Sequence, residues 1–307
     1  MSLPDDSSVP SDQLAEIRSA ADRLLRDGGA LGCFPTPVDQ IMRAAKVEVV
    51  PMQLDEGYLA RLRQKAEAAG IALLSALSKV WGVFDPKARV AFIDPQTPKN
   101  KLPFLKLHEG GHAVLAWQSV FGIFEDCQKT LDPDIKAQFE REANVFASEV
   151  LFQRENFTME ARDLAVEMKT PLFLAKRYGA SVYATVRRYV STSDRVCAVL
   201  IYNPPEAGPF GAVSTLRRAV TSPSFDRQFG QYAWPEVITS ADPFGSMVPV
   251  RRMINPRSLA LTDANGEQRE FVAESFRTPH QTFVLLHAGL TLSPRIILPS
   301  FVGAPYS

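Results

Sequence analysis

The sequence predicts an α+β fold, in which a mainly helical region comes first and a strand-rich region follows. At 307 residues with 46% hydrophobic content, the chain is long enough for two domains with real cores. The first part of the chain shows mainly the spacing of hydrophobic residues typical of helices, with few predicted strands. The second part shows short predicted strands separated by prolines and glycines. The expected divisions are a flexible tail at 1–11, a first domain at 12–157, a helical segment at 158–193 and an α+β domain at 194–307.

The elements of the first domain follow from local signals. The pair Thr36-Pro37 is typical of an N-cap followed by proline at the first helical position. Asp85-Pro86-Lys87 indicates the turn of a hairpin. The expected elements are helices over 12–26, 38–45 and 58–80, a strand over 47–51, a hairpin over 81–94, and helices over about 100–118 and 132–152.

An HExxH pattern, His108-Glu109-Gly110-Gly111-His112, lies in the helix expected over about 100–118. Side chains four positions apart share one face of an α-helix, so both imidazoles can reach one metal ion. Glu109 lies beside the first histidine, where its carboxylate can accept a proton from a water molecule. Two adjacent glycines cost roughly 1 kcal/mol each in a helix interior, so we expect this helix to pack closely against a strand that leaves no room for a Cβ atom.

The next helix offers Glu140, Glu142 and Glu149 as a third ligand. Glu140 and Asn144 are four positions apart and share a face, as a ligand and its neighbour would. At about 100° per residue, Glu142 points roughly 200° away from Glu140 and is expected to face solvent. Glu140 is therefore the predicted ligand.

The segment 158–193 and the region after it have different patterns. Leu174 to Tyr189 shows a helix, a turn at Gly179 and a second helix, with basic residues on both helices. DNA contact and packing against the first domain are the two interpretations, and the neutral chain favours packing. Beyond Asp194, strands are expected around 196–202, 258–261 and 283–286, with a hairpin turn at 263–266.

Residues Phe104 to His112, followed by Glu140 to Ala147 (EREANVFA), resemble the ImmA/IrrE family of zinc metallopeptidases. That family shows a phenylalanine shortly before HExxH and then ExxAN-x-FA on the next helix. The resemblance covers about residues 30–190 and implies a zincin-like fold. It implies Zn²⁺ held by His108, His112 and Glu140, with Glu109 as general base. Mn²⁺ is an alternative metal, because two histidines and one carboxylate do not exclude it.

The resemblance also implies a function. It points to a zinc-dependent endopeptidase that cleaves a protein substrate, a helix-turn-helix repressor of the XRE type, and so switches on stress-response or mobile-element genes. Longer members carry a GAF-like sensory domain, which suggests a regulatory role for 194–307. The alternative is a metal-containing binding protein that sequesters a regulator without cleaving it. An intact Glu109 favours catalysis, because a pure scaffold does not need it.

The composition of the chain limits the binding partners and the cellular location that we expect for it. Lys plus Arg and Asp plus Glu both number 34, so net charge gives no case for binding nucleic acid or a membrane. There is no apolar leader and no run of apolar residues long enough to cross a bilayer, so we expect a cytoplasmic protein. Cys33, Cys127 and Cys197 lie far apart and are expected to be buried free thiols. His280 and His287 are expected to be core or surface residues rather than catalytic groups.

Overall fold

The structure of the chain is a computed structural model. It describes residues 9–52, 82–118, 133–208, 211–239, 242, 244–247 and 252–288. The chain folds as two compact units, Met1–Tyr189 and Val190–Ser307. Helices dominate the first unit and an antiparallel sheet the second, which confirms the α+β class. The helix expected over 58–80 lies outside the described residues.

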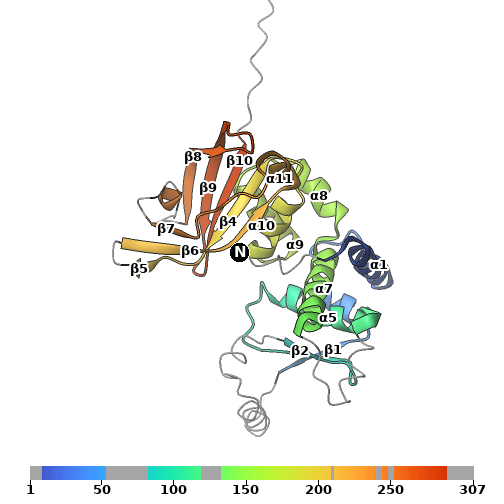
Figure 1. Cartoon of the computed structure of the whole chain (residues 1–307). Helices are drawn as coiled ribbons and strands as arrows, with labels where there is room; N and C mark the ends of the chain where they lie inside the picture. The colour runs from blue at the N-terminus through green and yellow to red at the C-terminus, as the bar shows by residue number, and fades with distance from the viewer. Residues whose placement is uncertain are drawn as a thin grey trace, which may run out of the picture. The chain divides into compact units, whose positions relative to one another are not determined.

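The first unit consists of helices and a small sheet that lies against α5 (Figure 1). β1 pairs in parallel with β3, and β3 pairs antiparallel with β2, so the predicted hairpin is confirmed. Among the residues that the structure describes, β2 lies at an edge of this sheet. The elements are α1 (Ser11–Asp27), α2 (Val38–Ala44), β1 (Glu48–Pro51), β2 (Gly82–Asp85), β3 (Val90–Ile93), α5 (Leu102–Val114), α7 (Pro133–Phe152), α8 (Glu155–Arg162), α9 (Lys169–Tyr178) and α10 (Val182–Ser191).

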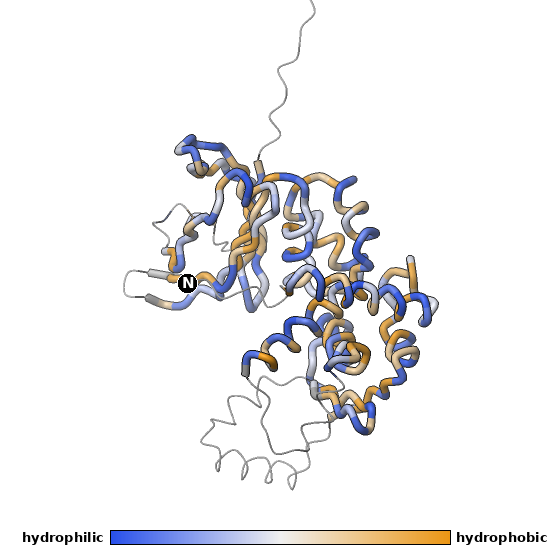
Figure 2. The backbone as a smooth tube through the Cα atoms, turned by 45° about the vertical axis from the view of Figure 1, so that its right-hand side comes forward, coloured by the Kyte–Doolittle hydropathy of each residue, from blue (hydrophilic) through white to orange (hydrophobic). Residues whose placement is uncertain are grey.

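Amphipathic patterns explain the packing of these helices. In α1, Ile17, Ala21, Leu24 and Leu25 recur at helical spacing and are buried. Figure 2 shows hydrophobic and hydrophilic residues alternating along the helices. Among the described residues, no helix is both long and apolar enough to cross a membrane.

The helix α5 packs against α7, and Gly111 permits this close approach. A Cβ atom on Gly111 would lie 3.3 Å from the Cα atom of Ala143 and 3.2 Å from the ring of Phe146. A Cβ atom on Gly110 would meet the sulfur of Met42, on α2, at 3.0 Å. The close approach predicted from Gly-Gly is therefore present, but the predicted neighbour is wrong, because helices and not a strand take up the space.

Gly111→Ala should destabilise the protein far more than Gly110→Ala. The first change pushes a methyl group against helix backbone, which cannot yield locally, and overpacking of this kind costs about 1–3 kcal/mol. The second displaces the flexible end of Met42 and gains roughly 1 kcal/mol of helix propensity. Urea denaturation of the two variants measures the difference, and equal losses of stability would contradict this packing account.

The predicted cap at Thr36 is wrong. Pro37 occupies the N-cap position of α2 and no side chain caps the helix. The Thr36 hydroxyl instead donates to the carbonyl of Leu151 at 3.2 Å and accepts from the side-chain amide of Gln153 at 3.1 Å. Thr36 therefore fastens this loop to the end of α7, a long-range contact that the local pattern does not reveal.

The helices α9 and α10 form the predicted helix–turn–helix arrangement. Gly179 ends α9 in the left-handed conformation, at φ 63°. Arg188 of α10 forms an ion pair with the buried Glu149 of α7, with Nη1 and Oε1 2.9 Å apart. This pairing supports the packing interpretation of the segment, because the Arg188 side chain is only 11% exposed.

The second unit is built on one sheet, whose strands follow the order β5-β6-β4-β10-β9-β8, with β7 paired to β6. All the residues of the central strand β4 are buried. The elements are β4 (Cys197–Tyr202), β5 (Glu206–Gly208), β6 (Gly211–Thr221), α11 (Pro223–Phe229), β7 (Val237–Thr239), η1 (Gly245–Met247), β8 (Met253–Thr262), β9 (Gln268–Arg277) and β10 (Thr282–Ala288).

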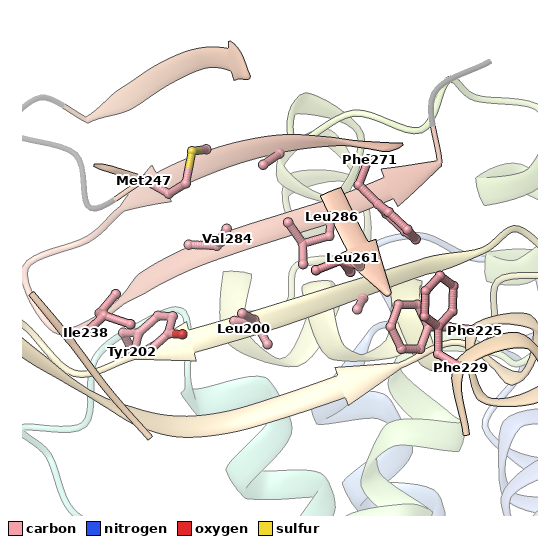
Figure 3. Close-up of a cluster of buried hydrophobic side chains, with 12 residues drawn as sticks. Leu200, Tyr202, Phe225, Phe229, Ile238, Met247, Leu261, Phe271, Val284 and Leu286 are labelled. Atoms are coloured by element: carbon pink, nitrogen blue, oxygen red, sulfur yellow. The ribbon is translucent and has the colours of Figure 1, made fainter. Parts of the chain in front are cut away.

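One face of this sheet carries the core of the unit (Figure 3). Phe225 and Phe229 of α11 stack with ring centroids 4.4 Å apart and pack with Leu200 and Leu286 of the sheet. The predicted β8–β9 hairpin is confirmed, and Gly266 has the positive φ that its turn requires. The GAF-like character of the unit stays a prediction.

Candidate metal centre

The helix α5 presents two imidazoles to the same space. His108 and His112 lie one turn apart, and their Nε2 atoms are 3.3 Å from each other. Their rings are nearly perpendicular, at 87°. The four-residue spacing of the HExxH pattern thus produces a pair of nitrogen donors aimed at one point.

Glu140 of α7 faces this pair. Its Oε2 atom lies 3.2 Å from Nε2 of His108, and its Oε1 atom lies 3.9 Å from Nε2 of His112. The Glu140 side chain is 50% exposed, so solvent reaches the cluster from its side.

The spacing of these donors fits a bound metal ion. Donors about 2 Å from a tetrahedral zinc ion lie roughly 3.3 Å apart, close to the observed separations. His108, His112 and Glu140 form a cluster whose ligand atoms all lie within 4.8 Å of one another. Two imidazole nitrogens and a carboxylate oxygen suit Zn²⁺, and they also suit Mn²⁺.

Two side-chain carbonyls orient the imidazoles. The Nδ1 atom of His108 lies 3.1 Å from Oδ1 of Asn144, and Nδ1 of His112 lies 2.7 Å from Oε1 of Gln118. A carbonyl oxygen only accepts, so each Nδ1 carries the proton and each Nε2 keeps its lone pair for a metal. Asn144 has the neighbouring position that the helix-face argument gave it.

The prediction that Glu142 faces solvent is wrong. Glu142 has no exposed surface, and its Oε2 accepts hydrogen bonds of 2.6 Å from the indole of Trp117 and the amide of Gln118. Its Oε1 accepts from the amides of Gln138 and Gln13. Rotation about α7 does place Glu142 away from Glu140, but that side of the helix is covered by other parts of the chain.

Glu109 is 5% exposed and lies against the edge strand β2. A Cβ atom on Gly82 would lie 2.6 Å from Oε1 of Glu109, so the glycine leaves room for this carboxylate. Burial raises the pKa of Glu109, the charge of His108 lowers it, and the charge of Glu140 raises it, with a net result of about 7. The carboxylate can therefore exchange a proton near neutral pH.

The two histidines differ in basicity. Burial lowers the pKa of His108, but its hydrogen bond to Glu140 and the charges of Glu109 and Glu140 outweigh burial, so the pKa is raised overall. Burial and the charge of His108 together lower the pKa of His112. Without a metal ion, His108 is therefore the more readily protonated of the pair.

In the metal-free protein, Glu109→Gln should stabilise the fold, and the gain should grow as pH rises from 4.5 toward 7. The folded-state pKa of Glu109 lies above its ordinary value of 4.5, at about 7. The folded wild type therefore binds more protons in this window, and its free energy of unfolding falls as pH rises. Thermal melts of both proteins with a chelator, at pH 5 and pH 8, measure the difference. An equal gain at both pH values would show that Glu109 does not titrate there.

The other candidate residues lie elsewhere. Glu149 is buried beside Arg188 and Arg18, and is therefore occupied by ion pairs. His287, in the second unit, has Nε2 3.3 Å from Oε1 of Glu274, while His280 is exposed. Cys197 is a buried free thiol as predicted, but Cys33 is exposed, which corrects that expectation. Cys127 lies outside the described residues.

Sequence reasoning missed Gln118, Trp117 and Gly82. Gln118 and Trp117 follow the end of α5, which stops at Val114, four residues before the end of the predicted helix. They reach Glu142 of α7 after Leu115 breaks the helix with an extended backbone, and no periodic pattern marks that break. Gly82 carried a weaker signal, since a glycine inside a strand often marks a close approach of another group.

A helix with HExxH, a glutamate from a second helix and a small sheet beside them define a zincin-like domain of the metallopeptidase class. Residues 44–189 match the family model Peptidase_M78, described as an IrrE N-terminal-like domain. Residues 44–189 are therefore similar to a metallopeptidase-like domain, as the sequence motifs predicted.

Two further comparisons concern whole chains. A solved structure described as a Mycobacterium tuberculosis transcriptional regulator is similar with a TM-score of 0.51 and 12% identity, over 96% of this chain and 96% of that chain. At this identity the likeness concerns the fold alone. None of the curated proteins compared matches the chain.

Proposed function

We propose that the protein is a zinc-dependent endopeptidase that hydrolyses a peptide bond in a protein substrate. The observation that carries this proposal is the convergence of Nε2 of His108, Nε2 of His112 and the carboxylate of Glu140, with Glu109 buried beside them. The family match over residues 44–189 supports the same reaction class. Mn²⁺ in place of Zn²⁺ would leave the proposal unchanged.

His108, His112 and Glu140 would hold the metal ion, and the buried Glu109 would move the proton. When bound, the metal supplies Lewis acidity that polarises the scissile carbonyl and makes water more acidic. Glu109 accepts a proton from the attacking water and returns it to the leaving amine. In the metal-free protein, burial already raises the pKa of Glu109 to about 7, which favours the protonated form of this carboxyl group.

The edge strand β2 supports an extended peptide as substrate. In the described part of the chain β2 pairs only with β3, so its other edge is an open strand edge, and Gly82 at the start of β2 lies beside Glu109. A substrate strand that pairs with such an edge gains main-chain hydrogen bonds that do not depend on its side chains. This arrangement would suit an endopeptidase, which must bind peptide on both sides of the scissile bond.

The proposed substrate is a helix-turn-helix repressor of the XRE type, whose cleavage would switch on stress-response or mobile-element genes. The support for this substrate is the resemblance of the motifs His108 to His112 and Glu140 to Ala147 to the ImmA/IrrE family. A selective protease must also favour one protein over others by differential affinity, and surfaces outside the metal centre would supply that.

Cleavage assays test the proposal. The full chain is incubated with Zn²⁺ or Mn²⁺, and the helix-turn-helix regulator encoded nearest to it is added in one arm and casein in another. We expect one cut in the regulator, abolished by a chelator, with casein digested far more slowly. A stable complex without fragments would favour the sequestering alternative. Rapid casein digestion with an intact regulator would refute the repressor assignment.

A further inference from the structure

A buried carboxylate lies two residues from the metal-site glutamate and does not face the metal site. Glu142 is fully buried and accepts hydrogen bonds from four neutral donors, the indole of Trp117 and the amides of Gln13, Gln118 and Gln138. Hydrogen bonds to an ionised acceptor are stronger than neutral ones. These donors are therefore held firmly in place around the carboxylate.

The orientation of the Gln118 amide follows from this arrangement. Its Nε2 lies 2.6 Å from Oε2 of Glu142 and 3.2 Å from the backbone carbonyl of Phe139. Both partners accept hydrogen bonds, so the nitrogen must point toward them and the oxygen toward His112. A flipped amide would place its oxygen against two other oxygens and lose both hydrogen bonds.

The amide orientation then sets the tautomer of His112. Oε1 of Gln118 lies 2.7 Å from Nδ1 of His112, so Nδ1 must donate and Nε2 must carry the lone pair. His108 is oriented separately, by Asn144. The two histidines therefore have different supports, and the support of His112 can be removed without touching that of His108.

We propose that Glu142 and Gln118 act as a relay that positions His112 for metal binding, with Glu142 fixing the Gln118 amide and the amide fixing the Nδ1–H tautomer and ring orientation of His112. Both are positioning residues, because Gln118 contacts only the Nδ1 side of His112 and Glu142 contacts Gln118, so neither offers an atom to the metal. The inference rests on the proposed metal centre. A charged acceptor at the far end also polarises the amide, which strengthens its hydrogen bond to the imidazole.

Gln118→Met and Gln138→Met form a matched pair of variants. Both remove a glutamine amide that donates to Glu142, but only Gln118 also contacts a histidine. Methionine keeps the length of the side chain and removes the acceptor. A general loss of stability around Glu142 would weaken zinc binding in both variants. Loss of the relay would change the His112 tautomer and weaken zinc binding only in Gln118→Met.

The direct readout is the tautomer of His112 in the metal-free protein. The chain has only four histidines, so nitrogen NMR of protein labelled at histidine, recorded above the imidazole pKa values, resolves each ring. A His112→Gln spectrum assigns the signal. We expect Nδ1–H at His112 in the wild type and in Gln138→Met, and a gain of Nε2–H in Gln118→Met.

Zinc affinity is the second readout, measured by competition with a chelating dye. Gln118→Met should weaken binding by about 10–100-fold, the usual loss when a group orienting a ligand is removed. Gln138→Met should stay within about threefold of wild type, well below that loss. An unchanged tautomer or an unchanged affinity in Gln118→Met would overturn the relay.

Gln118→Glu keeps an acceptor for His112 but loses the amide that donates to Glu142. A carboxyl group at this position still accepts from Nδ1 of His112, so the Nδ1–H tautomer should survive, and a proton on its other oxygen would donate to Oε2 of Glu142. Loss of this tautomer in Gln118→Glu together with its retention in Gln118→Met would refute the relay. A wild type that shows Nδ1–H at His112 yet binds neither Zn²⁺ nor Mn²⁺ would keep the hydrogen-bond relay and refute the proposed function, so the two failures are distinguishable.

Discussion

Glu109→Gln should reduce peptide cleavage by at least about a hundredfold while the protein keeps its metal and its fold. The change removes the proton acceptor but keeps the size of the side chain, so it fits the space beside Gly82. The donors of His108, His112 and Glu140 are untouched. Cleavage of the regulator, followed under single-turnover conditions, measures the loss.

The control for this variant is Glu155→Gln, which makes the same chemical change at an exposed position on α8. It should cleave like the wild type. The metal content of the Glu109→Gln protein shows whether activity is lost because the general base is missing or because the metal no longer binds. Full cleavage activity in a metal-loaded Glu109→Gln protein would remove Glu109 from the mechanism.

Glu140→Gln should weaken metal binding by more than about a hundredfold, which exceeds the loss expected for residues that only orient ligands. Glutamine keeps an oxygen but loses the negative charge that a divalent cation favours. Asp134→Asn, on the same helix and exposed, is the matched control and should leave the affinity unchanged. Metal analysis after dialysis, with a competition assay for affinity, measures both.

Glu142→Gln distinguishes a glutamate that supports the metal site from Glu140, the proposed metal ligand on the same helix. Because Glu142 lies in a hydrogen-bonded network away from the donors, its loss should lower stability and weaken metal binding by about 10–100-fold, less than the loss of Glu140. If Glu142→Gln loses the metal and Glu140→Gln keeps it, the assignment of the third ligand is wrong.

Local periodicity was enough to predict which side chains of each helix lie together at the candidate site. The four-residue spacing of His108 and His112 fixes a shared helix face, and the same spacing places Asn144 beside Glu140. These relations lie within single helices, where the spacing of residues in the sequence determines which side chains share a face. The pairing of α5 with α7 followed only from the expectation of one shared metal site, because the close approach at the glycines had been expected for a strand.

Periodicity failed where a helix has more than one covered side. The angle between Glu140 and Glu142 was right, but the inference to solvent assumed that α7 has a single buried stripe. In the structure Gln13 of α1 and Trp117 after α5 both reach Glu142. Contacts between segments this far apart in sequence do not show in any local pattern.

The second unit shows the same division between local and long-range features. The β8–β9 hairpin was predicted from its turn residues, which are contiguous. The pairing of β4 with β10, the first and last strands of the unit, was not predicted. The 11-residue strand β6 was also missed, because it pairs with β4, β5 and β7 along different parts of its length and so lacks one simple alternation.

X-ray absorption at the zinc edge of the zinc-loaded protein tests the central claim most directly. The account predicts about one zinc ion per chain, with two imidazole nitrogens and oxygen ligands at about 2.0–2.1 Å. In Glu140→Gln protein loaded with excess zinc, both imidazoles should remain among the ligands while binding weakens. Sulfur at about 2.3 Å, or a single imidazole in the wild type, would contradict a centre built from His108, His112 and Glu140.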